Sequence, residues 1–506
     1  MMPAKTFTPG GVRDRVAAKS TRSNKQINKR LLGNFAEDGN VNPQKKNGEP
    51  VCLPCPIALL RWERPGSEDM NMKDEKKEKD TTDLRRRSLL KNTAAATIGL
   101  GAMNAVSGIE AHAEEIIQPR APIPEIVQQA RPTVRESVKI TRLETMLVKP
   151  RWLFLKVHTN VGIVGLGEPI TEGRALTCAA AVKEIEPYLV GKDPRAVVHH
   201  WQAIYRHAFY RGGPILTSAL SGIDQALWDI KGKLLGVPVY ELLGGPTRQR
   251  IRVYAHAGTP ELIRERKGQG FTAFKTGPAR LDGRYARPVE NKAWIENAVA
   301  KFAELRQIVG KDGDIGIDFH GAVPPATAKI LMKELEQFQP FFYEEIINCQ
   351  NVDLMAELAK TTHIPIATGE RDFTKWGFRQ ILEKGAATIL QPDLCHAGGI
   401  TEVRLIAGMA EAYYATIAPH NPLGPISLAA GLQIAASIPN FLCQEQVSLG
   451  EGYIKNPFKV RDGYVDLPTG PGLGIELDEE AMKDKIGHDW RNAETYDPAD
   501  GSVVDW

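Results

Sequence analysis

The stretch Asp314-Ile315-Gly316-Ile317-Asp318-Phe319-His320-Gly321 is a short apolar segment with the pattern of a strand, and it ends in two polar side chains. Because the side chains of a strand alternate between its two faces, Asp318 and His320 are predicted to point the same way near the strand's end. This carboxylate and this imidazole are therefore the predicted centre of the protein's chemistry.

Polar residues close further apolar runs at a regular spacing. Glu344 follows the run 341–343 and Glu370 follows the run 364–367, each 26 residues after the preceding acid. One strand, one crossover helix and two loops need about that length. Three more strand-like runs end in the same way, at Asp393, His420 and Glu445.

This repeat predicts an α/β fold built on a TIM-like (β/α)7β barrel. Its eight strands are predicted at 251–257, 271–276, 314–320, 341–346, 364–369, 388–393, 415–420 and 441–446. In a parallel barrel every strand ends on the same face, where catalytic groups gather. Acidic residues at strand ends can also merely solvate loops, which explains any one of them but not six in register.

Three of these groups, Asp318, Glu344 and Glu370, are carboxylates from consecutive predicted strands. They converge without a Cys or His-rich cluster, which is the setting for a hard, oxygen-seeking divalent cation. Mg²⁺ fits this ligand set best.

A second unit precedes the barrel. Strand patterns at 140–145, 152–159 and 163–168 predict a three-stranded meander. Helical patterns follow at 175–189, 197–209 and 218–235, and the last ends at Gly236 as a helix C-terminus should. A meander followed by helices indicates an α+β capping domain. We predict that it is built from 137–248 and from a returning C-terminal tail, 461–506, with the barrel at 249–460.

The charge of the chain is divided unevenly. Residues 1–113 hold 20 Lys and Arg against 13 Asp and Glu, whereas the remaining 393 residues hold 44 against 48. Since the larger part is mildly acidic, nothing in its charge indicates nucleic-acid binding.

The basic segment contains the pattern of an export leader. The run Arg85-Arg86-Arg87-Ser88-Leu89-Leu90-Lys91 precedes a moderately apolar stretch, 92–109, and Ala111-His112-Ala113. A basic region, an apolar region and an Ala-x-Ala site make a removable leader, and the paired arginines resemble a twin-arginine signal. Asn, Thr, Gly and Ser dilute the apolar stretch, so cleavage is predicted and not a stable membrane anchor.

A start at Met70 or Met72 would give this leader an ordinary length. We therefore predict an upstream extension at 1–69, the signal at about 70–113 and a linker at 114–136. Export predicts a periplasmic location. The alternative is a cytoplasmic enzyme with a disordered basic tail.

Motifs in both units carry a resemblance to a known family. They are the run Ser221-Gly222-Ile223-Asp224-Gln225-Ala226-Leu227-Trp228-Asp229-Ile230-Lys231-Gly232-Lys233, the run Gly236-Val237-Pro238-Val239-Tyr240 and the run Pro471-Gly472-Leu473-Gly474. With the barrel residues, they make the chain from about Val138 to Trp506 resemble the mandelate-racemase branch of the enolase superfamily. Within that branch, four segments are similar to the D-galactonate dehydratases: 151–156, 209–216, 391–402 and 418–425.

The resemblance implies roles for the polar strand ends. Asp318, Glu344 and Glu370 match the family's Mg²⁺ ligands. His420 is the predicted general base, and Asp393 is predicted to accept its other ring N–H. An adjacent carboxylate fixes the tautomer and favours the imidazolium, so it strengthens the base.

The remaining roles concern the leaving group and the substrate carboxylate. His320 is predicted to give a proton to a departing β-hydroxyl, which favours dehydration. Glu445 matches a family acid that hydrogen-bonds the substrate carboxylate or enediolate, where a protonated carboxyl would donate. Lys275 is predicted to neutralise the substrate carboxylate, with a structural role as an equal alternative. It stands in Lys275-Thr276-Gly277, without the second lysine of the Lys-x-Lys found in many racemases of this branch.

These roles predict Mg²⁺-dependent dehydration of a small sugar acid, by resemblance D-galactonate to 2-dehydro-3-deoxy-D-galactonate. Three alternatives stay open: a dehydratase for another aldonate, a racemase or epimerase of the same branch, and an exported non-catalytic sugar-acid-binding protein. The family also implies a homo-oligomer. One departure is Ile346, which follows Glu344-Glu345 where the family usually has Pro, so the backbone leaving the fourth barrel strand is expected to differ.

Overall fold

The computed structural model describes residues 137–278, 292–487, 490–492, 494–497 and 500–503. The predicted upstream extension, twin-arginine signal and linker all lie outside these residues. Within the described part of the chain, no helix combines the length and the apolar character needed to cross a bilayer.

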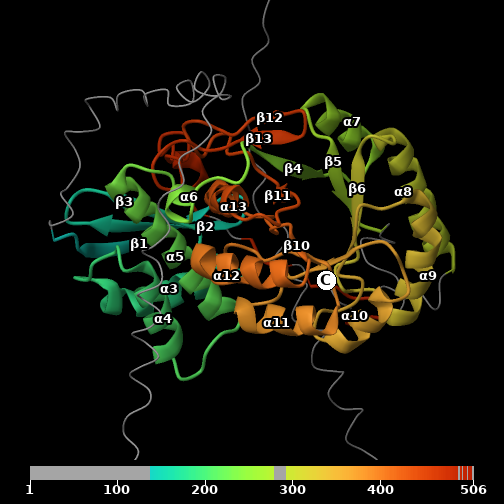
Figure 1. The fold of residues 1–506 in the computed structure, drawn as a ribbon, viewed down its shortest axis with the longest axis horizontal. Coiled ribbons are helices and arrows are strands. Elements are labelled where there is room, and N and C mark those ends of the chain that lie inside the picture. Colours follow the sequence, from blue (N-terminus) through green and yellow to red (C-terminus); the bar gives the residue numbers. More distant parts are fainter. Residues whose placement is uncertain (1–136, 279–291, 488–489, 493, 498–499, 504–506) are drawn as a thin grey trace, which may run out of the picture. The chain divides into compact units, whose positions relative to one another are not determined.

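Parallel strands of the described chain form the barrel (Figure 1). They are β4 (Arg250–His256), β5 (Ala273–Thr276), β6 (Asp314–Asp318), β7 (Tyr343–Glu344), β8 (Ile366–Thr368), β9 (Ile389–Leu390), β10 (Thr416–Ile417) and β11 (Gln444–Gln446). Strands β4 to β10 pair in sequence order, and β11 pairs with β4. Phe441, just before β11, bridges Ile417 of β10, so the two ends of the sheet come together.

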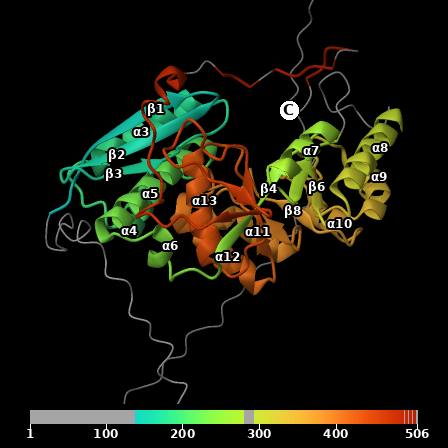
Figure 2. The ribbon, with the colours of Figure 1, turned by 90° about the horizontal axis from the view of Figure 1, so that it is seen from above.

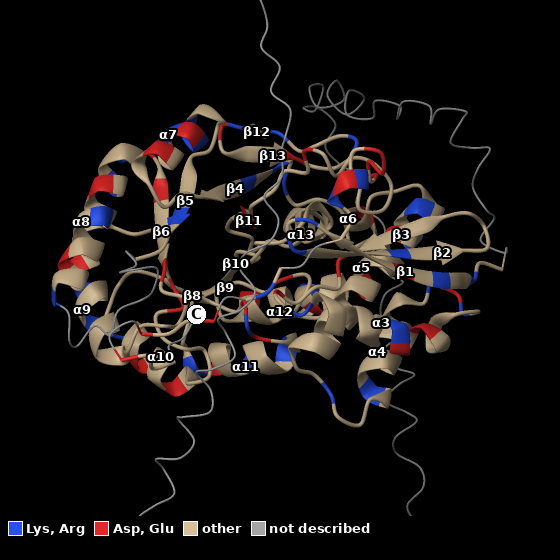
Figure 3. Ribbon diagram, turned by 180° about the vertical axis from the view of Figure 1, so that it is seen from behind, with Lys and Arg blue, Asp and Glu red and all other residues tan. Residues whose placement is uncertain are grey.

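A helix separates each barrel strand from the next. The helices are α7 (Pro260–Gly268), α8 (Lys292–Val309), α9 (Pro325–Leu335), α10 (Val352–Ala359), α11 (Thr374–Lys384), α12 (Gly399–Ala412) and α13 (Pro425–Ser437), with a 3-10 turn, η1 (Glu336–Phe338), after α9. Both signs of charge are spread over the outer helices α7 to α11 (Figure 3). Seven helices between eight strands, as found in the described residues, confirm the predicted (β/α)7β barrel.

Apart from β4, the ladders are shorter than the strands predicted from sequence. The predicted strand 388–393, for example, keeps only Ile389 and Leu390 in the ladder. Gln391, Pro392 and Asp393, the last residues of that predicted strand, form a buried loop beyond the ladder. Glu370, Asp393 and His420 therefore stand on short loops just past their strands, whereas Asp318, Glu344 and Glu445 lie within β6, β7 and β11.

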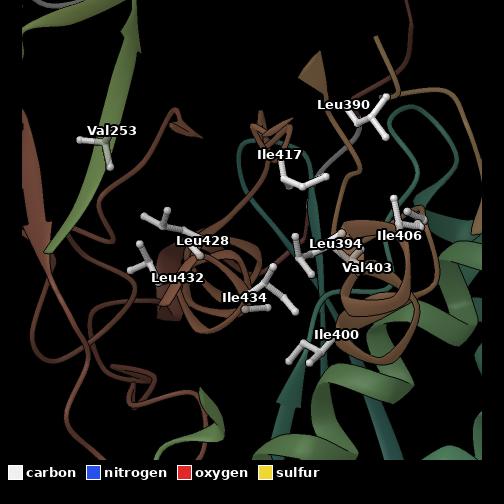
Figure 4. Close-up of a cluster of buried hydrophobic side chains, with 14 of the residues drawn as sticks. Val253, Leu390, Leu394, Ile400, Val403, Ile406, Ile417, Leu428, Leu432 and Ile434 are labelled. Carbon is white, nitrogen blue, oxygen red and sulfur yellow. The ribbon is translucent and has the colours of Figure 1, made fainter. Parts of the chain in front are cut away.

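Apolar side chains fill the barrel and the layer around it. Inside, Tyr254, Phe342 and Cys443 belong to one buried cluster. Outside, Leu390 and Ile417 of the strands share a cluster with residues of α12 and α13 (Figure 4). Each such aliphatic side chain contributes about 1.5–3 kcal/mol on burial, so the strand ends rest on a rigid frame. The four described cysteines are free and three of them are buried, as expected of core residues.

The capping unit begins with an antiparallel meander of β1 (Ile140–Val148), β2 (Trp152–Thr159) and β3 (Val164–Gly167), as predicted. Its helices are α3 (Ala175–Leu189), α4 (Val197–His207), α5 (Pro214–Leu235) and α6 (Val239–Leu242). Helix α5 runs along the meander (Figure 2). It starts four residues before the prediction, because Pro214 takes the first helical position, which favours proline.

Two glycines allow α5 to lie close to β3. A Cβ on Gly167 would stand 1.9 Å from the carbonyl oxygen of Gly222 in α5. A Cβ on Gly222 would stand 2.4 Å from the backbone nitrogen of Pro169. The helix ends at Gly236, whose φ of +70° is left-handed and suits glycine, as the sequence predicted.

The α5 run that carries the family resemblance joins the capping unit to the barrel. Asp224 accepts from Thr401 N at 2.9 Å, at the start of α12, and Trp228 Nε1 donates to Thr401 Oγ1 at 2.9 Å. Gln225 Nε2 donates to Leu394 O at 2.8 Å. These contacts hold the loop between β9 and α12 against the capping unit.

The C-terminal tail contacts both parts. It first forms a hairpin of β12 (Val460–Arg461) and β13 (Tyr464–Asp466), and β13 pairs antiparallel with β4 of the barrel. Beyond it, Val239 N donates to Gly472 O at 2.9 Å. After a short turn, η2 (Lys483–Lys485), Ile486 bridges Val148 of β1. The tail therefore extends the barrel sheet before it reaches the capping unit.

We expect Asp229→Ala to destabilise the fold by about 3 kcal/mol, because two buried backbone N–H groups lose the carboxylate that accepts their hydrogen bonds. Asp229 accepts from Leu166 N of β3 at 2.9 Å, from Leu473 N of the tail at 2.8 Å and from Lys233 Nζ at 2.6 Å. Urea unfolding measures the loss. The matched control is Glu479→Ala, which removes an exposed partner of Lys156 and should cost less than about 1 kcal/mol. Equal stability of the two variants would contradict this role of Asp229.

Candidate active site

Three carboxylates stand at the ends of consecutive barrel strands. Asp318 and Glu344 are the last residues of β6 and β7, and they are paired in register. Glu370 stands two residues after β8. Parallel strands end on one face, so the structure brings these three predicted residues to the same end of the barrel.

His420 and Asp393 form a buried pair on the neighbouring loops. Each stands three residues after its strand, β10 and β9 respectively. His420 Nδ1 donates to Asp393 Oδ2 at 2.8 Å, which leaves Nε2 facing Glu370 Oε2 at 3.4 Å. Burial lowers the pKa of His420, but Glu370, Glu445 and the hydrogen bond to Asp393 together raise it well above the usual value. These neighbours favour the imidazolium, which is the form that the ring takes once it has accepted a proton.

Asp318, His320 and Glu370 form a group that fits a cation. Their ligand atoms all lie within 4.8 Å of one another, and His320 Nε2 is 3.2 Å from Asp318 Oδ2. Glu370 Oε2 is buried and accepts no hydrogen bond from the described residues. A buried carboxylate oxygen without a donor is costly, and a hard divalent cation would satisfy it.

Glu344, the third predicted ligand, is engaged by protein donors on both oxygens. Lys275 Nζ lies 2.7 Å from its Oε1, and Gln391 Nε2 donates to its Oε2 at 2.7 Å. The same ammonium group is 2.8 Å from Glu445 Oε1 and 3.4 Å from Asp318 Oδ2. Lys275, predicted to meet the substrate carboxylate, is thus buried among three carboxylates of the protein.

Glu445 is a buried carboxylate whose surroundings favour its ionised form. Besides Lys275, it accepts from Asn421 N at 2.9 Å and contacts His256. Burial opposes ionisation, but Lys275, His420 and His256 hold the pKa of Glu445 well below its usual value. The protonated carboxyl expected from the sequence therefore differs from the form that these contacts favour.

The backbone turns sharply directly after β7. Glu345 has a left-handed φ of +42°, and the two isoleucines that follow, Ile346 and Ile347, are buried. The side chain of Glu345 is buried and pairs with Arg371, next to Glu370. The isoleucines are anchored in the core, so the position of Glu344 at the strand end is kept.

A cavity of about 190 Å³ opens above these groups. His320, Glu370 and His420 line it together with Arg371, and the capping unit and the tail contribute to its walls. Both imidazoles predicted to move protons therefore border one space. Its remaining lining residues are Thr171, Glu172, Pro214, Phe373, His396 and Asn492.

His396, Glu172 and Arg371 were not singled out from the sequence. His396 lies in the quoted segment 391–402, three residues after Asp393, where a search for polar residues beyond the first strand-end position would have found it. Glu172 follows the meander and is held by Arg151, whose guanidinium is 2.7 Å from Glu172 Oε1. Only the tertiary structure shows that these residues share a cavity with the strand ends.

A (β/α)7β barrel with a meander-and-helix cap and carboxylates at its mouth defines an enolase-type protein. The family model described as "Mandelate racemase / muconate lactonizing enzyme, N-terminal domain" matches residues 125–244, and the one described as "Enolase C-terminal domain-like" matches 259–481. The chain belongs to the mandelate racemase and muconate lactonizing enzyme family of the enolase superfamily.

Named relatives are similar over their whole length. The D-galactonate dehydratase of Ralstonia nicotianae is 47% identical over 387 residues, which cover 73% of this chain and 100% of that protein. The D-galactonate dehydratase of Pectobacterium atrosepticum is 45% identical over 388 residues, with the same coverage.

Solved structures of enolase-type proteins are also similar to this chain. An enolase from Agrobacterium radiobacter with Na and L-malate bound has a TM-score of 0.67 and 31% identity, covering 72% of this chain and 99% of that one. A mandelate racemase/muconate lactonizing enzyme from Jannaschia sp. has a TM-score of 0.66 and 32% identity, covering 70% and 99%.

Proposed function

We propose that this protein is a Mg²⁺-dependent hydro-lyase that converts D-galactonate to 2-dehydro-3-deoxy-D-galactonate. Its relatives named D-galactonate dehydratase support the reaction and the substrate class. The single structural observation that carries the proposal is that His420, paired with Asp393, and His320 line the same cavity. An elimination needs a base and an acid. A histidine with a carboxylate partner can be the base, and a second histidine can be the acid.

His420 accepts the proton from C2 on its Nε2. Its Nδ1–H is held by Asp393, so in the neutral imidazole the lone pair lies on Nε2. Asp393 then stabilises the imidazolium that forms. A positioned base of this kind contributes typically 10²–10⁴-fold to the rate.

His320 gives a proton to the departing C3 hydroxyl. The electron pair of the C2–H bond forms the C2–C3 double bond, and the C3–O bond breaks as its oxygen takes the proton and leaves as water. The enol that remains tautomerises to the 2-keto acid. His320 is positioned by its backbone, since its N–H donates to Asp318 Oδ1 at 2.8 Å.

Asp318, Glu344 and Glu370 would hold the Mg²⁺. When bound, the ion supplies positive charge where the substrate carboxylate gains negative charge after the C2 proton has left. Glu370 has a buried oxygen suited to this ligand role. The surrounding frame of short loops on a packed barrel keeps the ligand oxygens in place.

Incubation with a panel of sugar acids and Mg²⁺ tests the function. We expect D-galactonate to give a 2-keto-3-deoxy acid, detected by its keto group, and the reaction to stop on chelation of the metal. If the protein turns over only a different aldonate, that aldonate replaces D-galactonate as the assigned substrate. Exchange of the C2 proton with solvent deuterium and retention of the hydroxyl would identify an epimerase, and binding without either reaction would identify a binding protein.

We propose in addition that the protein is exported, on the basis of the twin-arginine pattern at 85–91. A fusion of residues 70–115 to a reporter should reach the periplasm. Replacing both Arg86 and Arg87 by Lys should retain the reporter in the cytoplasm, because the signal is read through the arginine pair. Full export of the double-Lys fusion, or no export of the native one, would contradict the proposal.

A further inference from the structure

We propose that His396 is a specificity-determining residue that donates a hydrogen bond from Nε2 to a hydroxyl on the part of the sugar acid remote from its carboxylate. The inference rests on the proposed function and extends it to a residue without an assigned role. It is carried by the place of His396 in the cavity and by the chain of hydrogen bonds behind its ring.

His396 is a buried member of the cavity wall. Its side chain belongs to the loop between β9 and α12, and it lines the same space as His420 and Glu370. In a buried imidazole that borders a ligand cavity, one ring nitrogen can face a ligand while the other contacts the protein. The two ring nitrogens therefore have different partners.

Hydrogen bonds from the capping unit favour one tautomer of the neutral ring. Thr171 Oγ1 donates to Ser218 Oγ at 2.8 Å, and Ser218 Oγ lies 3.0 Å from His396 Nδ1. When Ser218 accepts from Thr171, its own O–H is available to donate, and we assign that proton to His396 Nδ1. A neutral imidazole that accepts at Nδ1 carries its proton on Nε2.

The Nε2–H of His396 has no hydrogen-bond acceptor at ordinary distance among the described residues. The nearest recorded partner is Asp393 Oδ2, at 3.7 Å, which is beyond hydrogen-bond range. His396 borders the cavity, so a ligand oxygen placed beside Nε2 would accept a hydrogen bond from it. His396 is thus a donor prepared for a ligand.

The neighbouring charges select a hydroxyl as that ligand oxygen. Asp393 is close to Nε2, and the carboxylates of Glu172 and Glu370 also line the cavity, so an anionic group at this place would be repelled. A hydroxyl is neutral, accepts from His396 and can donate to a carboxylate at the same time. The substrate's own carboxylate belongs with the cation at the strand ends, so the hydroxyl comes from its distal chain.

The test compares two variants whose amide nitrogens take the places of different ring nitrogens of His396. In His396→Gln the amide nitrogen can reach the place of Nε2, whereas in His396→Asn the shorter amide reaches only the place of Nδ1. Both are made with His420→Asn, so that ligand binding is measured without turnover. Calorimetry with Mg²⁺ then gives the affinity for D-galactonate and for glycolate, a two-carbon hydroxy acid with no distal hydroxyls.

We expect His396→Asn to weaken D-galactonate binding about tenfold, the worth of one hydrogen bond to a buried donor, and His396→Gln to weaken it less than about threefold. Glycolate affinity should be unchanged in both. Parent-like galactonate affinity in His396→Asn, or an equal loss for glycolate, would overturn the role of His396 alone. No binding of D-galactonate by the His420→Asn parent, together with no turnover by the unmodified protein, would overturn the proposed function as well.

Discussion

His420→Asn is expected to lower kcat for D-galactonate by about three orders of magnitude while Mg²⁺ affinity changes little. The asparagine amide nitrogen can still donate to Asp393 from near the place of Nδ1, but nothing remains at Nε2 to accept the C2 proton. The size of the effect follows from the rate contribution of a positioned base, typically 10²–10⁴-fold. Initial rates of keto-acid formation measure kcat, and calorimetry measures the metal affinity.

Exchange of the C2 proton provides a second measurement for the same variant. If His420 is the base, the variant should also fail to exchange deuterium from solvent into substrate that is recovered. His320→Asn is the matched control, because it leaves the base in place. It should slow water loss while exchange at C2 continues. Normal turnover in His420→Asn, or exchange lost only in His320→Asn, would remove the assignment of the base.

Glu370→Gln is expected to weaken Mg²⁺ binding at least about 100-fold. Loss of an outer-shell partner already costs 10–100-fold in metal affinity, so loss of a charged ligand should cost more. Glu370 is the acid whose buried oxygen accepts no hydrogen bond from the described residues, so its place in the ligand set does not depend on moving another side chain. Calorimetric titration with MgCl₂ measures the affinity, and unchanged affinity would exclude Glu370 as a ligand.

Two further variants separate the candidate ligand sets. We expect Glu344→Gln to weaken Mg²⁺ binding as much as Glu370→Gln, and His320→Asn to change it less than about threefold, because Mg²⁺ prefers carboxylate oxygen to imidazole nitrogen. The opposite result would place the ion on the group Asp318, His320 and Glu370. Lys275 would then be a permanent partner of Glu344.

The α5 run shows how a motif that identifies a family can act at a distance from the chemistry. Its residues contact no reacting group, but Asp224 and Gln225 bind α12 and the loop before it. That loop carries Asp393 and His396. The capping unit therefore helps to set both the base's partner and the wall of the cavity, and Ser218 of the same helix orients the His396 ring.

The sequence by itself determined the barrel, the cap and the set of strand-end residues. Periodic apolar runs with a polar residue at each end are a local property, and in a parallel barrel they lead to one face whatever the details of packing. Helix α3 and strand β2 have the predicted bounds for the same reason, since their local apolar pattern was enough to place them. Asp318, Glu344, Glu370, Asp393, His420 and Glu445 accordingly meet at one end of the barrel.

Only the tertiary structure decided which of these groups contact one another. The contacts of Lys275 with three carboxylates and of Ser218 with His396 join side chains that are 43 to 178 residues apart along the chain. The interaction energy between two charges in a buried site depends strongly on their separation over a few ångströms. Strand spacing fixes no such distances, so the partners of each group follow from the packing of cap, loops and barrel.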